Sequence, residues 1–211
     1  MSIRSFRFRR VLFFFASLLV ICGTASVAGW SLNLSLGQGR GKAIGKTFTR
    51  NSVVEFEEIK VAGKPVKFDQ RFDGNDDWIP TVGFKAKNIS DKPIVYLAVN
   101  INFPESRARL GGAMMSYPIE FGQRPDSALP SRGEPMVLLP NDTVEISLQN
   151  HYPGIKAFIE RRLTLKEIHQ ADLEVNFVIF DDKTGWSAGN YYRQDPVNPD
   201  RYINIGDKPN Q

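Results

Sequence analysis

Three oxygen-bearing side chains, those of Asp73, Asn75 and Asp77, alternate along a short polar segment. This is the spacing of the first ligands in a calcium-binding loop, in which glycine stands at the sixth position and a bidentate glutamate at the twelfth. In this chain Trp78 occupies the sixth position and Phe84 the twelfth. We therefore expect a solvated loop, and we expect that the chain binds neither a metal nor a cofactor.

The residue types that most often carry catalysis are few and scattered. His151 and His169 are the two histidines of the chain, and neither lies beside a serine in a recognisable nucleophile motif. Cys22 is the only cysteine, and it lies in an apolar N-terminal run. The chain after this run therefore has neither a disulfide nor a thiol nucleophile. No glycine-rich phosphate-binding loop follows a predicted strand, so we expect a protein that is not an enzyme.

Large amphipathic side chains can instead form contact surfaces. Tyrosine and tryptophan bind both proteins and sugars, because each combines a flat apolar ring with a polar group. Methionine adapts to varied partners because its side chain is flexible. The candidates for a contact surface are Trp78, Trp186, Tyr191, Tyr192, Met114 and Met115. Alternatively, Trp186 and Tyr191 fill one end of the hydrophobic core, and the two methionines pack against its open edge.

The first 28 residues have the three parts of an export signal. Four arginines stand within the first ten residues, an apolar run extends from Val11 to Cys22, and small residues lead to Ala28. A signal peptide at 1–28 predicts an extracytoplasmic location, either periplasmic or secreted. The alternative is an uncleaved anchor, because residues 11–30 are long enough to span a bilayer. The chain would then be held at the inner membrane, facing out.

The distribution of charge argues against a nucleic-acid partner. The chain has 27 Lys and Arg against 23 Asp and Glu, a net charge of +4. Four of the basic residues lie in the predicted signal peptide, and the 23 that remain equal the 23 acidic residues. A neutral remainder gives no general attraction to nucleic acid. Residues 29–51 combine several glycines with scattered Lys and Arg and predict a flexible basic linker.

Residues 52–211 alternate between short β patterns and turn-forming segments, which is typical of a single antiparallel β-sandwich. A bulge at Glu57 and Glu58 would reset the alternation of the first strand. The strands 82–87 and 94–103 are expected to form a hairpin through the turn-rich segment between them. An irregular tail ends the domain. The predicted strands are 54–61, 66–72, 82–87, 94–103, 117–121, 143–148, 171–180, 186–192 and 201–205.

Side-chain alternation predicts which residues enter the core. It places Val99 and Phe177 on the inward faces of their strands. The strands 171–180 and 186–192 are expected to form the closing hairpin, with Gly185 in a left-handed turn position. Tyr191 and Tyr192 are neighbours on a strand and must point to opposite faces. One tyrosine is therefore expected in the core, and the other is the leading candidate for a contact residue.

Between the strands 143–148 and 171–180 the apolar period changes to that of a helix. A stripe of apolar residues follows Pro153 and Gly154, and Thr164 and Glu167 have the spacing of a capping box. We predict a short helix and one further helical turn, which together form a crossover before the last hairpin. The residues of the stripe are Ile155, Phe158, Ile159 and Leu163.

Two parts of the chain resemble exported bacterial immunoglobulin-like modules, of which FxLYD-like domains are one group. These parts are VGFKAKNISDKPIV at 82–95 and LPNDTV at 139–144. The segment FDDKTGWSAGNYYR at 180–193 is similar to the closing hairpin of secreted bacterial proteins. The resemblance implies an immunoglobulin-like sandwich and carries over no functional residue. The helical crossover departs from a plain immunoglobulin-like module.

These observations favour a non-catalytic interaction module of the bacterial cell envelope that binds another protein. The alternative is a carbohydrate- or cell-wall-binding module that uses exposed Trp and Tyr. A membrane contact is expected only through an uncleaved N-terminal segment.

Overall fold

The computed structural model describes residues 41–124, 134–199 and 201–206, and strands dominate this part of the chain. The strands form two sheets, and all of them lie in one unit, Gly41–Gln211. The fold is therefore mostly β, as the sequence predicts. The predicted signal peptide lies outside the described residues, as do most of the excursion between residues 123 and 135 and the last five residues.

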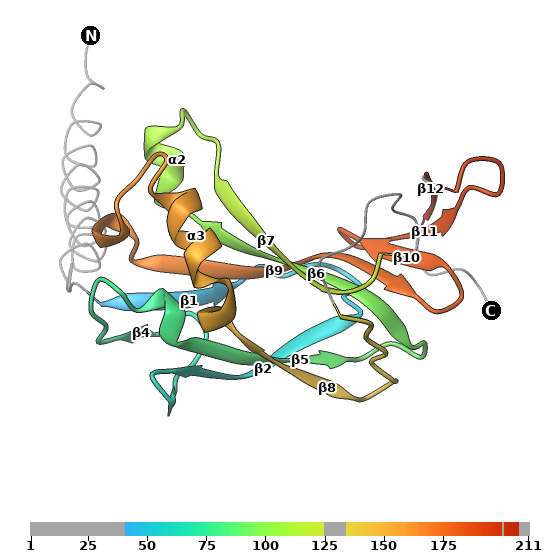
Figure 1. Cartoon of the computed structure of the whole chain (residues 1–211), viewed down its shortest axis with the longest axis horizontal. Helices are drawn as coiled ribbons and strands as arrows, with labels where there is room; N and C mark the ends of the chain where they lie inside the picture. Colours follow the sequence, from blue (N-terminus) through green and yellow to red (C-terminus); the bar gives the residue numbers. More distant parts are fainter. Residues whose placement is uncertain (1–40, 125–133, 200, 207–211) are drawn as a thin grey trace, which may run out of the picture. The chain divides into compact units, whose positions relative to one another are not determined.

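The large sheet is built around its longest strand, β9 (Gln170–Phe180). One edge of β9 pairs with β6 (Ile94–Phe103), which has the predicted bounds, and β6 pairs in turn with β7 (Met115–Gly122). Both pairings are antiparallel. The central strands β6 and β9 run through the layer drawn above β5 in Figure 1.

The other edge of β9 is shared between two strands. Its first half pairs in parallel with β1 (Lys42–Lys46), and β1 pairs with β4 (Arg71–Phe72). Its second half pairs with β10 (Thr184–Ser187), which is followed in the sheet by β11 (Asn190–Gln194) and β12 (Tyr202–Gly206). The parallel β1–β9 pair corrects the prediction of a purely antiparallel fold.

The small sheet has the strand order β3-β2-β5-β8 and is antiparallel throughout. Its strands are β2 (Val54–Val61), β3 (Lys64–Pro65), β5 (Val82–Asn88) and β8 (Thr143–Ser147). The predicted bulge in β2 is confirmed, because its register against β5 shifts between Glu57 and Lys60. The predicted strand 66–72 is wrong, since β3 ends before it and β4 covers only its last two residues.

Short helices lie in several of the connections between strands. The predicted crossover before the last hairpin is confirmed: η2 (Leu148–His151), α3 (Tyr152–Ile159) and η3 (Leu165–Glu167) link β8 to β9. The other helices are η1 (Ile79–Thr81) before β5 and α2 (Ser106–Arg109) after β6. Within the described ranges, no helix is long and apolar enough to cross a membrane.

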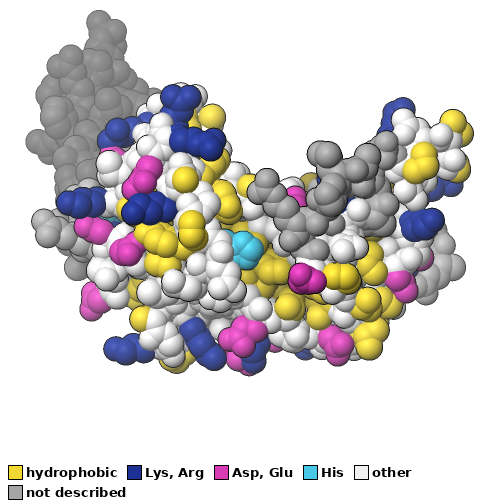
Figure 2. All heavy atoms as spheres, in the orientation of Figure 1, with side chains coloured by type: hydrophobic (Ala, Val, Ile, Leu, Met, Phe, Trp, Pro, Cys, Tyr) yellow, Lys and Arg dark blue, Asp and Glu magenta, His cyan; other side chains and the backbone are white. Residues whose placement is uncertain are grey.

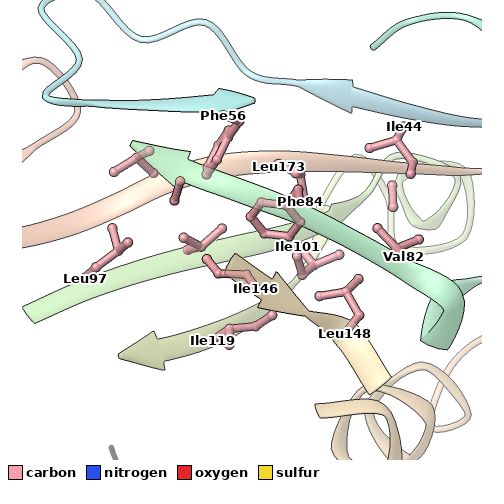
Figure 3. Packing of buried hydrophobic residues seen from close by; sticks show 14 of the residues in the cluster. Ile44, Phe56, Val82, Phe84, Leu97, Ile101, Ile119, Ile146, Leu148 and Leu173 are labelled. Atoms are coloured by element: carbon pink, nitrogen blue, oxygen red, sulfur yellow. The ribbon is translucent and has the colours of Figure 1, made fainter. Parts of the chain in front are cut away.

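The two sheets face each other across one hydrophobic core (Figure 3). Phe84 of β5 lies at its centre, with its ring centroid 5.4 Å from that of Phe56 on β2. Leu97 and Ile101 of β6 approach these rings from the large sheet. Full burial of such a side chain contributes roughly 1.5–3 kcal/mol, and this shared core holds the sheets together.

The predicted hairpin between 82–87 and 94–103 is wrong, because β5 and β6 lie in different sheets. The connection between them turns around the fully buried side chain of Asn88. Its amide nitrogen donates to the carbonyl oxygens of Lys92 at 2.8 Å and Leu138 at 2.9 Å, while its amide oxygen accepts from Ser90. Turn-forming residues reveal that the chain turns here but not that it changes sheet.

The predicted flexible linker 29–51 is wrong from Lys42 onward, where β1 begins. This short strand has only one strongly apolar position, Ile44, and it is held by its pairing with β9. Gly45 permits that pairing to be close. A Cβ atom at Gly45 would lie 2.3 Å from Oδ1 of Asp172 on β9.

Val99 is fully buried, as predicted, but Phe177 is not in the core between the sheets. Ala98 pairs with Phe177 and Val99 pairs with Val175, so Asn176 is an extra residue on β9. Such a bulge reverses the side-chain alternation beyond it. Phe177 consequently lies half-buried on the opposite face of the large sheet.

The closing hairpin also differs from the prediction at its turns. Lys183, with φ +64°, occupies the left-handed position between β9 and β10, whereas Gly185 belongs to β10. A second turn at Ala188 and Gly189, both with positive φ, divides the predicted strand 186–192 into β10 and β11. Gly185 is needed for close approach, since an added Cβ would lie 3.1 Å from the carbonyl oxygen of Val178.

Candidate functional site

Four of the six predicted contact residues are buried, which excludes them from a surface. Trp78 is 1% exposed and donates from Nε1 to the carbonyl oxygen of Ile168 at 3.2 Å. Trp186 is fully buried, and Tyr191 stacks on Phe180 with ring centroids 6.4 Å apart. Met115 is buried at the start of β7. The burial of Trp186 and Tyr191 agrees with the alternative interpretation, in which they fill the core.

Tyr192 and Met114 are the two predicted contact residues that remain half-buried. The alternation predicted for the tyrosine pair is confirmed, because Tyr191 faces the core while Tyr192 packs against Phe177 on the other face of the sheet. Residue type alone cannot make this distinction, because a large aromatic ring stabilises a core as well as a binding surface.

The loop that resembles half of a calcium site is engaged in other contacts. The side-chain oxygen of Asn75 accepts from the backbone N–H of Asp77 at 3.1 Å, and Asp77 accepts from the hydroxyl of Tyr152 on α3. Burial, together with Asp77, raises the pKa of Tyr152 to about 12. Across the described residues, no group of three or more His, Cys, Asp or Glu side chains could hold a metal ion.

The two histidines have separate surroundings. His151 lies with its ring edge towards Phe121, at a centroid distance of 5.9 Å, and burial lowers its pKa. His169 lies 3.4 Å from Nζ of Lys42 through Nδ1, and its backbone N–H donates to Glu105. Lys42 is itself 2% exposed and donates to the carbonyl oxygen of Ile168. These contacts join β1 to the segment before β9, which is a structural arrangement.

A cluster of rings lies on the outer face of the large sheet, the face turned away from the small sheet. We call it the outer aromatic cluster: Tyr96, Phe177, Tyr192 and Tyr202. Phe177 lies at its centre, with centroid distances of 6.5 Å to Tyr96, 6.5 Å to Tyr192 and 5.6 Å to Tyr202. All three ring pairs meet edge to face, which is one of the arrangements that aromatic pairs prefer.

A depression of about 260 Å³ adjoins this cluster. It forms over Ala98, a small side chain that β-pairing places between Glu120 of β7 and Phe177 of β9. Larger neighbours on both sides of a small residue leave a hollow, because cross-strand neighbours stand about 5 Å apart. Ligand pockets for drug-sized molecules usually occupy roughly 300–1,000 Å³, so this depression has room for one side chain or one sugar ring.

The rim of the depression is polar. Glu120, Arg124, Asn176 and Ser187 line it together with the rings and Pro118. The guanidinium carbon of Arg124 lies 5.5 Å from the ring centroid of Phe177, a cation–π geometry. The hydroxyl of Ser187 donates to the carbonyl oxygen of Asn176 at 2.6 Å, which fixes the bulge at the edge of the hollow.

No local pattern in the sequence predicts this site directly. Its central residue, Phe177, fitted the inward face by strict alternation, and only the bulge at Asn176 moved it outward. The useful signal was Ala98, a small residue among large ones on β6, together with the polar neighbours Asn100 and Asn102 on the same face. No protein-family model, no curated protein and no solved structure matches this chain.

Proposed function

We propose that this chain is a non-catalytic interaction module of the bacterial cell envelope, which binds another protein through the outer face of its large sheet. The observation that carries the proposal is the depression over Ala98, with its aromatic floor and its charged rim. Protein interfaces combine an apolar centre rich in Tyr and Phe with a polar surround in which Arg is frequent. Glu120 and Arg124 supply charges of both signs beside the rings.

The way the rings pack favours a protein partner over a sugar. Sugars stack on the open flat face of an aromatic ring, but Arg124 lies over Phe177, and the rings of the cluster pack edge to face on one another. Tyr96 is only 2% exposed. A partner side chain that enters the depression needs no open ring face, because it contacts the edges of the rings and the side chain of Ala98.

The compartment is proposed from the N-terminal sequence. Residues 1–28 have the composition of a signal peptide, which supports a location outside the cytoplasm, either periplasmic or secreted. If the signal is retained, the same domain faces outward from the inner membrane. We also propose that the two sheets form an immunoglobulin-like sandwich, which the resemblance of residues 82–95 implies and the change of sheet at Asn88 supports.

Photocrosslinking in living cells tests the protein partner. A photoreactive amino acid at Ser187 or Glu120, on the rim of the depression, is expected to give a discrete heavier adduct whose second component is identified by mass spectrometry. The matched control is the same amino acid at Lys64, an exposed position on β3 of the other sheet. Adducts of equal yield at all three positions, or at none, would remove the outer face as the binding surface.

A carbohydrate- or cell-wall-binding module is the second candidate. It is favoured by the size of the depression and by the half-buried rings of Tyr192 and Tyr202, which pack against Phe177 in its lining. Sedimentation with purified peptidoglycan and a glycan array distinguish the two candidates. Retention by one of these that is lost in Tyr192→Ala, without a protein adduct from Ser187, would establish the second candidate in place of the first.

A further inference from the structure

Basic side chains gather at one end of the domain, over α2 and α3. Figure 2 shows Lys and Arg side chains concentrated there, in the region where Figure 1 draws these helices. All of them are exposed. We call them the basic patch: Arg107 and Arg109 of α2, Lys156 of α3, Arg161 and Arg162 after α3, and Lys166 of η3.

Tertiary contacts bring these elements together. Arg109 forms an ion pair with Glu167, which joins α2 to η3. The backbone N–H of His169 donates to Glu105, the residue before α2, at 2.9 Å. The turn after α3 is fixed by Leu163, which is 5% exposed and donates to the carbonyl oxygen of Ile159. The patch is therefore built on anchored backbone.

Three acidic residues lie among these six basic residues and compensate part of their positive charge. Glu167 pairs with Arg109, Glu160 directly after α3 lies 4.0 Å from Lys156, and Glu105 stands directly before α2. Arg107, Arg161, Arg162 and Lys166 have no ion pair within the part of the chain that the structure describes. The acidic loop before Trp78 meets α3 at its opposite end, where Asp77 accepts from Tyr152.

The chain enters the described domain beside this patch. The backbone N–H of Ala43 donates to the carbonyl oxygen of His169 at 2.8 Å, and Lys42 donates to that of Ile168, directly after η3. In the sequence, about ten residues separate this entry from the apolar run that could span a bilayer. An extended chain covers at most roughly 3.5 Å per residue, so a retained apolar run would keep this entry point within about 35 Å of the membrane.

We infer that the basic patch docks the domain on a membrane surface that carries anionic phospholipids. Long, exposed Lys and Arg side chains on three short elements can each meet a separate lipid phosphate, and each one near an anionic surface adds to the attraction. The inference does not depend on the outer-face contact surface, which lies on other elements and serves a different partner.

Fluorescence quenching by lipids tests the inference on the chain as cells export it. If the exported protein retains the N-terminal segment, Cys22 is replaced by serine. A fluorophore is attached at Ala108→Cys, an exposed position inside the patch. The protein is combined with vesicles whose headgroups carry a nitroxide quencher. We expect strong quenching with phosphatidylcholine–phosphatidylglycerol vesicles, weak quenching with phosphatidylcholine alone, and loss of the difference in high salt. A label at Ile89→Cys, at the distant turn before β6, should respond equally to both lipids.

Two variants with equal loss of charge complete the test. The first variant removes the unpaired charges of the patch by four substitutions: Arg107→Gln, Arg161→Gln, Arg162→Gln and Lys166→Gln. We expect its apparent affinity for anionic vesicles to be about ten-fold lower, or lower still. The control variant removes four exposed positive charges elsewhere in the domain: Lys64→Gln, Lys67→Gln, Lys183→Gln and Arg193→Gln. Its affinity for anionic vesicles should be unchanged. If circular dichroism shows that the first variant does not fold, a double variant with Arg161→Gln and Arg162→Gln replaces it.

Equal quenching at Ala108→Cys in both kinds of vesicle, or an unaltered response in the patch variant, would overturn the inference. Binding of polyglutamate by the patch without any preference for anionic vesicles would assign it to an acidic protein instead and would likewise exclude the membrane.

Discussion

At the scale of single residues, burial decides which of two like side chains can contact a partner. Tyr191 and Tyr192 are adjacent and of one type, yet the first stacks on Phe180 in the core and the second packs on Phe177 at the outer face. Tyr191 is 7% exposed, whereas Tyr192 is half-buried beside the depression. The two residues should therefore respond differently to truncation.

We expect Tyr191→Ala to lower the free energy of unfolding by about 3 kcal/mol, the usual scale for removing a large ring from a core. Tyr192→Ala should cost about 1 kcal/mol, because much of its ring already contacts water, but it should weaken the adduct formed from Ser187. Urea unfolding and crosslinking yield measure the two effects. Equal losses of stability in both variants would contradict the assigned faces.

Two glycines of ordinary backbone conformation provide a second comparison. A Cβ at Gly45 would lie 2.3 Å from Oδ1 of Asp172, whereas one at Gly83 would lie no closer than 3.6 Å to a neighbour. Gly45→Ala should destabilise the fold by roughly 1–3 kcal/mol through overpacking, and Gly83→Ala should stay within about 1 kcal/mol of the parent. Thermal unfolding measures both. Adding Asp172→Ala to Gly45→Ala should recover part of the loss, and a purely additive result would show that the two sites do not clash.

At the scale of elements, a turn and a crossover are joined by one ion pair. Nζ of Lys92, in the crossover from β5 to β6, lies 2.6 Å from Oδ2 of Asp182, in the turn between β9 and β10. Burial would raise the pKa of Asp182, but hydrogen bonds from Lys92 and Thr184 outweigh it and hold the pKa below its ordinary value of 3.8. The pair thus fastens the ends of three strands of the large sheet.

A lowered carboxyl pKa sets the sign of the pH dependence. The folded state favours the ionised form, so the stabilisation is present above pH 3.8 and is lost as the pH falls through the folded-state pKa. Asp182→Asn keeps an oxygen for Thr184 but removes the charge. We expect it to cost up to about 1 kcal/mol at neutral pH, because both partners are partly exposed, and the deficit should shrink below pH 3.8. A deficit that is constant from pH 7 to about 3, in urea unfolding, would exclude the ion pair as its cause.

At the scale of the whole molecule, the two sheets and the N-terminal segment differ in what they contribute. The sheets share one core, to which the short helices also contribute, with Ile79 of η1 and with Ile155 and Ile159 of α3. The N-terminal segment has the basic start and the apolar run of an export signal, and we propose that it directs the chain out of the cytoplasm. Under this proposal, the first 28 residues decide the compartment of the folded domain.

Reporter fusions at the C-terminus test this export. An enzyme that is active only outside the cytoplasm should be active when fused after Gln211, and one that needs the cytoplasm should be inactive. Replacing the arginines among the first ten residues by glutamate should reduce the first activity without changing the core. Activity of the cytoplasmic reporter in the parent fusion would rule out the proposed compartment.

The sequence by itself determined most of the elements of this fold. Alternation over 94–103 predicted β6 to the residue, because a strand with one inward face needs apolar side chains at every second position. The apolar stripe from Ile155 to Leu163 predicted α3, and the Glu167 carboxylate accepts the backbone N–H of Thr164 at 2.8 Å, as its capping spacing required. These features depend on neighbours a few residues away, which the sequence contains.

Only the tertiary structure decided how these elements combine. The change of sheet at Asn88, the parallel pairing of β1 with β9 and the bulge at Asn176 each depend on partners far along the chain. The bulge matters most for function, because one extra residue turned Phe177 from the core to the outer face and placed it beside Ala98. Local patterns cannot contain that shift, since it arises from the register between two strands that are about 80 residues apart.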